Sequence, residues 1–98
     1  MNEYMIVIRF TASYDEKFLA LIPLQRVQVN YLLEKRIITS YSLSADRETL
    51  WVTLLATSRE GAEKTLRMMP LHNYMQYEIV DLMFHNSPIH ESIHLSLN

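Results

Sequence analysis

The stretch that decides how the second half of the chain folds is Met69-Pro70-Leu71-His72-Asn73-Tyr74-Met75-Gln76-Tyr77-Glu78-Ile79-Val80. Apolar residues recur at helical spacing before it and end with Leu66 and Met69. Proline has no backbone N–H and cannot continue a helix, so Pro70 helps to end this one. After a short turn, apolar and polar residues alternate over residues 75–79, which is typical of a strand. The stretch therefore predicts a helix, a turn and a strand in that order.

The rest of the chain supplies three more strands and a longer helix. We expect strands over residues 3–10, 37–44, 49–57 and 74–84, one helix that follows Ser13 and ends near Lys35, and one that Ser58 caps and Pro70 helps to end. The order β-α-β-β-α-β is the ferredoxin-like arrangement, an antiparallel four-stranded sheet with both helices on one face. The sequence therefore predicts the α+β class.

The first helix has a start signal and an internal proline. Ser13-Tyr14-Asp15-Glu16 reads as a capping box, in which Ser13 caps the helix and Glu16 reaches back to it. Pro23 removes a backbone donor inside the helix, so we expect a kink or a restart there. The residues expected to be buried are Phe18, Leu19, Ile22, Val29 and Leu33.

Both faces of the predicted sheet are apolar. Tyr4, Ile6, Ile8 and Phe10 suit the face toward the helices, yet Met5 and Val7 lie between them. Residues 50–55 are apolar on both sides as well. An exposed patch of this size is unusual on a monomer, so we expect a second copy to pack sheet against sheet. That arrangement is a dimeric α+β barrel.

Composition excludes several classes of protein. The chain has 98 residues, 49% of them hydrophobic, which suits one domain over residues 1–88 followed by a tail over residues 89–98. It contains no cysteine, so disulfides and thiolate metal sites are excluded. The net charge of −2 with scattered basic residues argues against a nucleic-acid partner. The apolar run near the N-terminus is too short to span a bilayer, so we expect a soluble, cytoplasmic protein without a membrane partner.

The tail leaves two possibilities open. Ile93, Leu95 and Leu97 alternate with polar residues, so the tail could pair with a sheet edge of its own or a neighbouring subunit, or it could be a frayed end. His90 and His94 have a spacing that would suit zinc on a helix, but the alternation indicates an extended chain and no third ligand is evident. We therefore predict no metal site.

Strand parity directs a polar group into the predicted barrel. Arg9, Gln76, Glu78 and the ring of Tyr74 are expected to point away from the helices. One interpretation is structural, an ion pair of Arg9 with Glu78 or a salt link across the dimer. The other is functional: burial favours the neutral form of Glu78, which would move a proton on an acid held by Arg9. Tyr41 is a further aromatic residue that could line a pocket, and no cofactor motif is present.

The stretch quoted first resembles the Leu-Pro-Leu-x-x-Tyr-Met-x-x-x-Val motif near the end of the muconolactone isomerases, small enzymes that shift a ring double bond. His85 occupies the family's histidine position, in a segment that typically reads Leu-Cys-Arg-His-Pro-Ser. Strand two departs from the family, because Ile38-Thr39-Ser40-Tyr41-Ser42 stands where the isomerases carry Trp-Arg-His-Leu-Trp. Positions that keep the family's residue type are Pro70, Leu71, Tyr74, Met75, Glu78, Leu82 and His85.

The resemblance implies a homodimeric or larger α+β barrel that binds a small organic acid or lactone without a cofactor. A proton-transfer isomerisation is one possible activity. The alternative is a non-catalytic dimeric barrel for ligand binding or assembly, so whether the chain is an enzyme stays open. The candidate catalytic residues are Glu78 and His85, and the candidate substrate-binding residues are Arg9, Tyr41, Tyr74 and Gln76.

Overall fold

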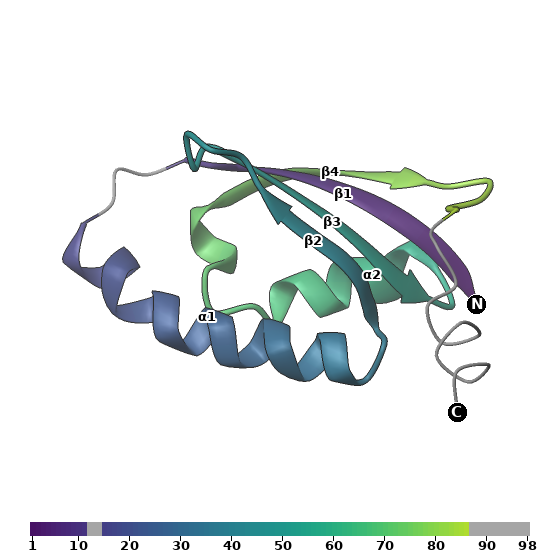
Figure 1. The fold of residues 1–98 in the computed structure, drawn as a ribbon, viewed down its shortest axis with the longest axis horizontal. Coiled ribbons are helices and arrows are strands. Elements are labelled where there is room, and N and C mark those ends of the chain that lie inside the picture. Colours follow the sequence, from purple (N-terminus) through teal and green to yellow (C-terminus); the bar gives the residue numbers. More distant parts are fainter. Residues whose placement is uncertain (12–14, 87–98) are drawn as a thin grey trace, which may run out of the picture.

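Four antiparallel strands form one sheet, and both helices cover the same face of it (Figure 1). The computed structural model describes residues 1–11 and 15–86. The spatial order of the strands is β2-β3-β1-β4, which confirms the predicted ferredoxin-like α+β class. The elements are β1 (Asn2–Phe10), α1 (Glu16–Glu34), β2 (Ile38–Leu43), β3 (Thr49–Ala56), α2 (Arg59–Arg67), the 3-10 turn η1 (His72–Tyr74) and β4 (Met75–Asp81).

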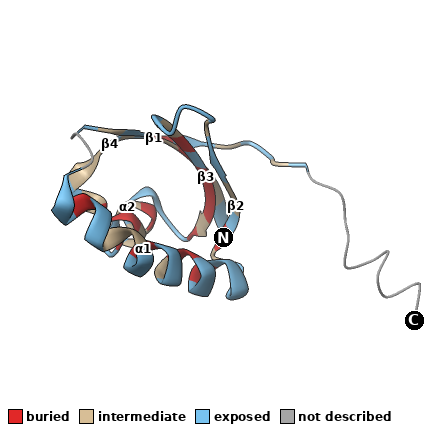
Figure 2. Ribbon diagram, turned by 60° about the vertical axis from the view of Figure 1, so that its left-hand side comes forward, coloured by how far each residue is buried: buried red, intermediate tan, exposed pale blue. Residues whose placement is uncertain are grey.

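The core lies between the sheet and the helices, as Figure 2 shows by the buried residues on their facing sides. Tyr4, Ile6 and Ile8 of β1 are buried there, whereas Met5 and Val7 are half-buried on the other face. The alternation read from the sequence is therefore the alternation of the structure, because successive strand residues point to opposite faces. Core side chains from the other elements are Val29, Leu32, Ile38, Leu50, Val52, Leu54, Ala62, Leu66 and Ile79.

Helix α1 differs from its prediction at its start and in its buried residues. Asp15 is the N-cap, and its carboxylate accepts the N–H of Phe18 at 2.8 Å, so the capping box assigned to Ser13 is wrong. Ser13 itself lies outside the described residues. Leu19 and Leu33 were expected in the core but are 52% and 38% exposed. The buried side chains of α1 are Phe18, Gln25, Val29 and Leu32.

Pro23 does not interrupt α1, which runs as one helix to its C-cap at Lys35. The expected restart is therefore wrong. Proline lacks the N–H that would bond to the carbonyl four residues earlier, in this case that of Leu19. Both residues are exposed, so water can take the place of the missing bond.

The second half follows its prediction except at β4. Ser58 caps α2 by accepting the N–H of Gly61 at 3.1 Å, as predicted. Strand β4 covers Met75–Asp81 instead of residues 74–84. Tyr74 belongs to the turn before the strand. At the other end of β4, the N–H of Leu82 bonds the carbonyl of Glu3, which lies next to the first residue of the antiparallel partner β1. A strand cannot extend past the strand that supplies its hydrogen bonds.

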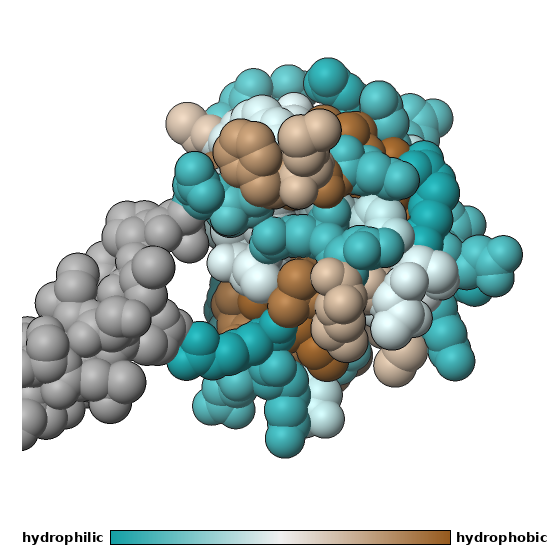
Figure 3. Space-filling view, turned by 90° about the vertical axis from the view of Figure 1, so that its right-hand side faces the viewer, coloured by the Kyte–Doolittle hydropathy of each residue, from teal (hydrophilic) through white to brown (hydrophobic). Residues whose placement is uncertain are grey.

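Three further observations concern the surface, the C-terminal residues and the helices. Apolar residues reach the surface between polar ones at the end of the molecule that faces the viewer in Figure 3. The residues of the tail predictions, both for pairing with a sheet edge and for the absence of a metal site, lie outside the described part of the chain. They are Ile93, Leu95, Leu97, His90 and His94. No helix in the described part of the chain is long and apolar enough to cross a membrane.

The N-cap of α1 gives a direct test of this description. Replacing Asp15 by Ala should lower the free energy of unfolding by about 1 kcal/mol, because the N–H of Phe18 loses its acceptor. Asp15→Asn keeps a side-chain oxygen and serves as the control, with most of the stability retained. Urea denaturation followed by circular dichroism measures both. Equal stability of Asp15→Ala and the parent would contradict the assignment of the cap.

Candidate functional site

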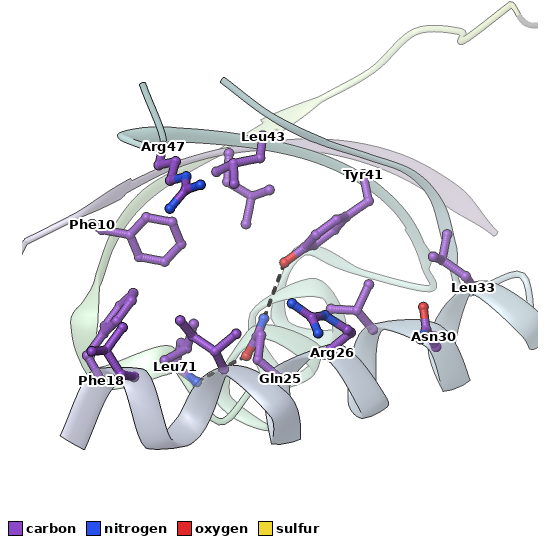
Figure 4. A pocket seen from close by; sticks show the side chains of 14 residues that line it. Phe10, Phe18, Gln25, Arg26, Asn30, Leu33, Tyr41, Leu43, Arg47 and Leu71 are labelled. Atoms are coloured by element: carbon purple, nitrogen blue, oxygen red, sulfur yellow. Dashed lines mark hydrogen bonds between the residues drawn. The ribbon is translucent and has the colours of Figure 1, made fainter. Parts of the chain in front are cut away.

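A cavity of about 400 Å³ opens between α1 and the sheet (Figure 4). Phe10 and Phe18 form its aromatic end, with their rings edge-on at 5.6 Å between centroids. Its aliphatic lining includes Leu19, Ile22, Val29, Leu33, Leu43, Leu50 and Leu71. A volume of this size, mostly apolar with few polar groups, is typical of sites for small molecules.

The cavity explains why two predicted core residues of α1 are exposed. Leu19 and Leu33 line it, so their side chains face the space between helix and sheet without being covered. Leu43, at the end of β2, borders the same space and is also exposed. Helical periodicity identified the correct side of the helix, but it could not reveal that the sheet stands away from it here.

Gln25 is the buried polar residue at the base of the cavity. Its side-chain oxygen accepts the backbone N–H of Leu71 at 3.1 Å. Its amide nitrogen donates to the hydroxyl of Tyr41 and to the sulfur of Met69, each at 3.5 Å. The dashed lines in Figure 4 mark its bonds to Tyr41 and Leu71. One side chain thus connects α1, β2 and the segment after α2.

Tyr41 presents a neutral hydroxyl to the cavity. Burial raises the pKa of Tyr41 above its ordinary value, because the charged phenolate is poorly solvated there, while the bond from Gln25 acts in the opposite direction. The hydroxyl accepts from Gln25, so its own proton is available for another acceptor. A ligand carbonyl or carboxylate oxygen in the cavity would be such an acceptor.

A bulge in β2 brings Tyr41 to this face of the sheet. The pairing with β3 shifts between Ile38 and Ser40, so that Thr39 and Ser40 both bond the hydroxyl of Thr53 on the far face. An extra residue in a strand moves each side chain that follows it to the opposite face of the sheet. Tyr41 therefore points toward the helices and lies outside the barrel cavity in which it was expected.

Two arginines supply positive charge to the cavity. Arg26 reaches it from α1 and Arg47 from the turn between β2 and β3 (Figure 4). No carboxylate among the described residues lines it. Guanidinium groups pair well with carboxylates, so this lining favours an anionic ligand.

The turn that carries Arg47 is held in an unusual conformation. Arg47 has φ of 66°, in the left-handed region, and its N–H bonds the carbonyl of Ser44 at 2.9 Å. The carboxylate of Asp46 accepts the Ser44 hydroxyl at 2.5 Å and the N–H of Glu48 at 2.9 Å. These bonds, that of Ser44 first, hold the pKa of Asp46 below its ordinary value. The network supports a backbone shape that a residue other than glycine rarely adopts.

The other predicted site residues lie away from this cavity. Arg9 faces Gln76 across the strands and Glu78 faces Val7, and all three polar side chains are exposed on the sheet face opposite the helices. The salt bridges among the described residues do not include one between Arg9 and Glu78. Strand parity thus assigned these residues to the correct face, and that face is open to solvent in the single chain.

Tyr74 and His85 do not lie beside Arg9, Gln76 and Glu78 on the outer face of the sheet. The ring of Tyr74 packs edge-on against Phe18 at 5.2 Å between centroids, so the expectation that it points away from the helices is wrong. Its place in the turn before β4 frees it from the strand's alternation. His85 lies beyond the end of β4, at the opposite end of that strand from Tyr74.

Gln25, Arg26 and Arg47 are the site residues that sequence reasoning missed. Gln25 had a signal, since it occupies a helix position that faces the core together with Phe18 and Val29. A polar residue there must find a partner, which makes it a candidate for a site. The sequence contained no signal for Arg26 and Arg47, because arginines are common on protein surfaces and nothing distinguishes these two. Among the described residues, no cluster of ligating side chains could hold a metal ion.

Comparison with known proteins supports the fold. The chain superimposes on a crystal structure of muconolactone isomerase with a TM-score of 0.73 and 21% sequence identity, over 90% of this chain and 95% of that chain. No protein-family model matches the sequence, and no curated protein matches it either. The protein is therefore an α+β protein with a muconolactone isomerase-like fold, and the similarity at this identity extends to the fold alone.

The role of Gln25 can be measured directly. Gln25→Leu should lower the free energy of unfolding by about 1–3 kcal/mol, because the buried N–H of Leu71 loses its acceptor. Gln28→Leu, on the same helix but outside the buried set, is the matched control and should change stability little. Urea denaturation compares the variants. A Gln25→Leu protein as stable as the parent would show that this bond does not hold the elements together.

Proposed function

We propose that the cavity between α1 and the sheet binds a small, largely apolar organic acid or lactone. The observation that supports this most is an apolar cavity of about 400 Å³ that Arg26 and Arg47 line. No Asp or Glu of the described residues lines it. The arginines would hold the ligand's negative charge. The hydroxyl of Tyr41 would donate to its carbonyl oxygen, and Phe10 and Phe18 would pack on its apolar part.

The cavity suits binding better than proton transfer. A double-bond shift needs a group that takes and returns a proton. Neither a carboxylate nor a histidine among the described residues lines this cavity, and burial raises the pKa of Tyr41, which disfavours its ionised form as a base. The cavity thus suits a protein that binds a ligand without catalysis. The proposed location is the cytoplasm, with which a chain that lacks cysteine is compatible.

The outer face of the sheet supports a second candidate, proton transfer in a dimer. Trp51 and Val80 are exposed apolar residues on this face, and Met5 and Val7 are half-buried beside them. A second copy packed against it would enclose Arg9, Gln76 and Glu78. Glu78 could then act as a base on a ligand held by Arg9. His85 belongs to this second proposal only, because it follows β4 and does not line the cavity.

Ligand titration separates the two sites. Muconolactone, a lactone that carries a carboxylate, is the first probe, followed by simple keto acids, with binding measured by calorimetry. Arg26→Gln and Arg47→Gln should each weaken binding about tenfold or more, because each removes a charged partner of the carboxylate. Arg9→Gln removes the same charge from the outer face and should leave binding unchanged. Loss of binding in Arg9→Gln alone would place the ligand between two sheets instead.

The dimer proposal has its own test. Light scattering at micromolar concentration should give at least twice the mass of one chain, and Trp51→Glu should reduce it, because a charge would be buried between the sheets. If Glu78 is a base, Glu78→Gln should lower the isomerisation rate on the order of a hundredfold while the mass stays unchanged. A stable monomer of the parent would rule out the barrel and with it the role of Glu78.

A further inference from the structure

The side of α1 that faces away from the sheet carries an apolar stripe. Leu24, Val27 and Tyr31 are 57%, 68% and 52% exposed, and Ala20 lies one turn before them. The steps between these four residues alternate between four and three, which places them along one line of the helix. The buried residues of the same helix lie on the opposite side, toward the sheet (Figure 2). We call residues 17, 20, 24, 27, 31 and 34 the outer stripe.

A charged residue of opposite sign stands at each end of the outer stripe. Lys17 precedes Ala20 by three positions and Glu34 follows Tyr31 by three. The ion pairs recorded among the described residues are those of Arg59 with Asp81 and Arg67 with Glu63, so neither end charge is paired within the described chain. The stripe is thus apolar in the middle, positive at its start and negative at its end.

This pattern is complementary to itself when it is reversed. In an antiparallel pair centred between Leu24 and Val27, each Leu24 meets the second copy's Val27. Each Ala20 meets the second copy's Tyr31, so a small side chain faces a large one. Each Lys17 meets the second copy's Glu34, and opposite charges lie in contact at both ends.

The parallel arrangement lacks this complementarity. It would place Tyr31 on Tyr31, Lys17 on Lys17 and Glu34 on Glu34. Like charges in contact are destabilising. The Tyr31 pair would also be crowded, whereas the Ala20 pair would leave a gap. Charge and size therefore both select the antiparallel orientation.

We propose that α1 pairs antiparallel with α1 of a second copy of this chain through the outer stripe. The contact has four apolar layers and is smaller than a standard stable interface, so it associates chains weakly. None of the stripe residues lines the cavity, so the pairing does not compete with a ligand there. It is also separate from the outer face of the sheet, because α1 covers the other face (Figure 1).

Disulfide cross-linking tests the pairing and its orientation in the full-length chain, which has no cysteine of its own. Ala20→Cys and Tyr31→Cys are prepared separately, mixed and oxidised. The mixture should form a disulfide-linked dimer that contains one copy of each variant, identified by mass spectrometry. Each variant alone should stay unlinked, because equivalent positions are about 16 Å apart along the helix axis in this register, beyond the reach of a disulfide.

Reversal of the end charges provides an independent measurement. Lys17→Glu and Glu34→Lys should each weaken self-association several-fold, measured by sedimentation of the uncross-linked protein. The double variant should restore it, because the opposite charges meet again. Lys64→Glu on α2 changes the net charge of the chain by the same amount as Lys17→Glu and should have no effect.

Several results would overturn the proposal. Cross-linked dimers of Ala20→Cys with itself would show parallel pairing. The absence of any cross-link would show that no second copy lies on the stripe, as would a double charge variant no better than either single one. The last two results would also follow if residues 87–98 of the same chain covered the stripe.

Discussion

The side-chain amide of Gln25 is the contact on which the arrangement of helix, sheet and turn depends. Its oxygen accepts the N–H of Leu71, and its nitrogen donates to Tyr41 and Met69. A buried N–H without an acceptor is costly, so the segment after α2 is held against α1. The same group meets β2 through Tyr41. The three elements therefore converge on a polar residue, and the apolar cavity opens beside it.

The sheet separates two chemically different surfaces. The helix side offers an apolar cavity with two arginines and a neutral phenol, which suits the recognition of an anion. The outer side carries Glu78 and Arg9 in the open, beside exposed Trp51. A ligand in the cavity cannot reach Glu78, because the sheet lies between them. A ligand bound in the cavity and the carboxylate of Glu78 therefore lie on opposite faces of the sheet in one chain.

Features set by neighbouring residues could be predicted, and features set by distant contacts could not. The alternation along β1 predicted its buried face, and the Ser58 cap was read from adjacent residues. Asp15 could not be chosen over Ser13 as the cap of α1, because both have suitable oxygens and only the path of the chain decides between them. The end of β4 depends on where its antiparallel partner β1 begins, which no local pattern records.

The sequence by itself determined the order of strands and helices, the α+β class, and the two faces of β1, because each follows from periodicity within a few residues. Only the tertiary structure decided which polar side chains share a site. The bulge after Ile38 turns Tyr41 toward the helices, and this bulge arises from the pairing of β2 with β3. Gln25 and Leu71 come together from distant parts of the chain. Register and packing among several elements set these positions, and neither is contained in any one segment.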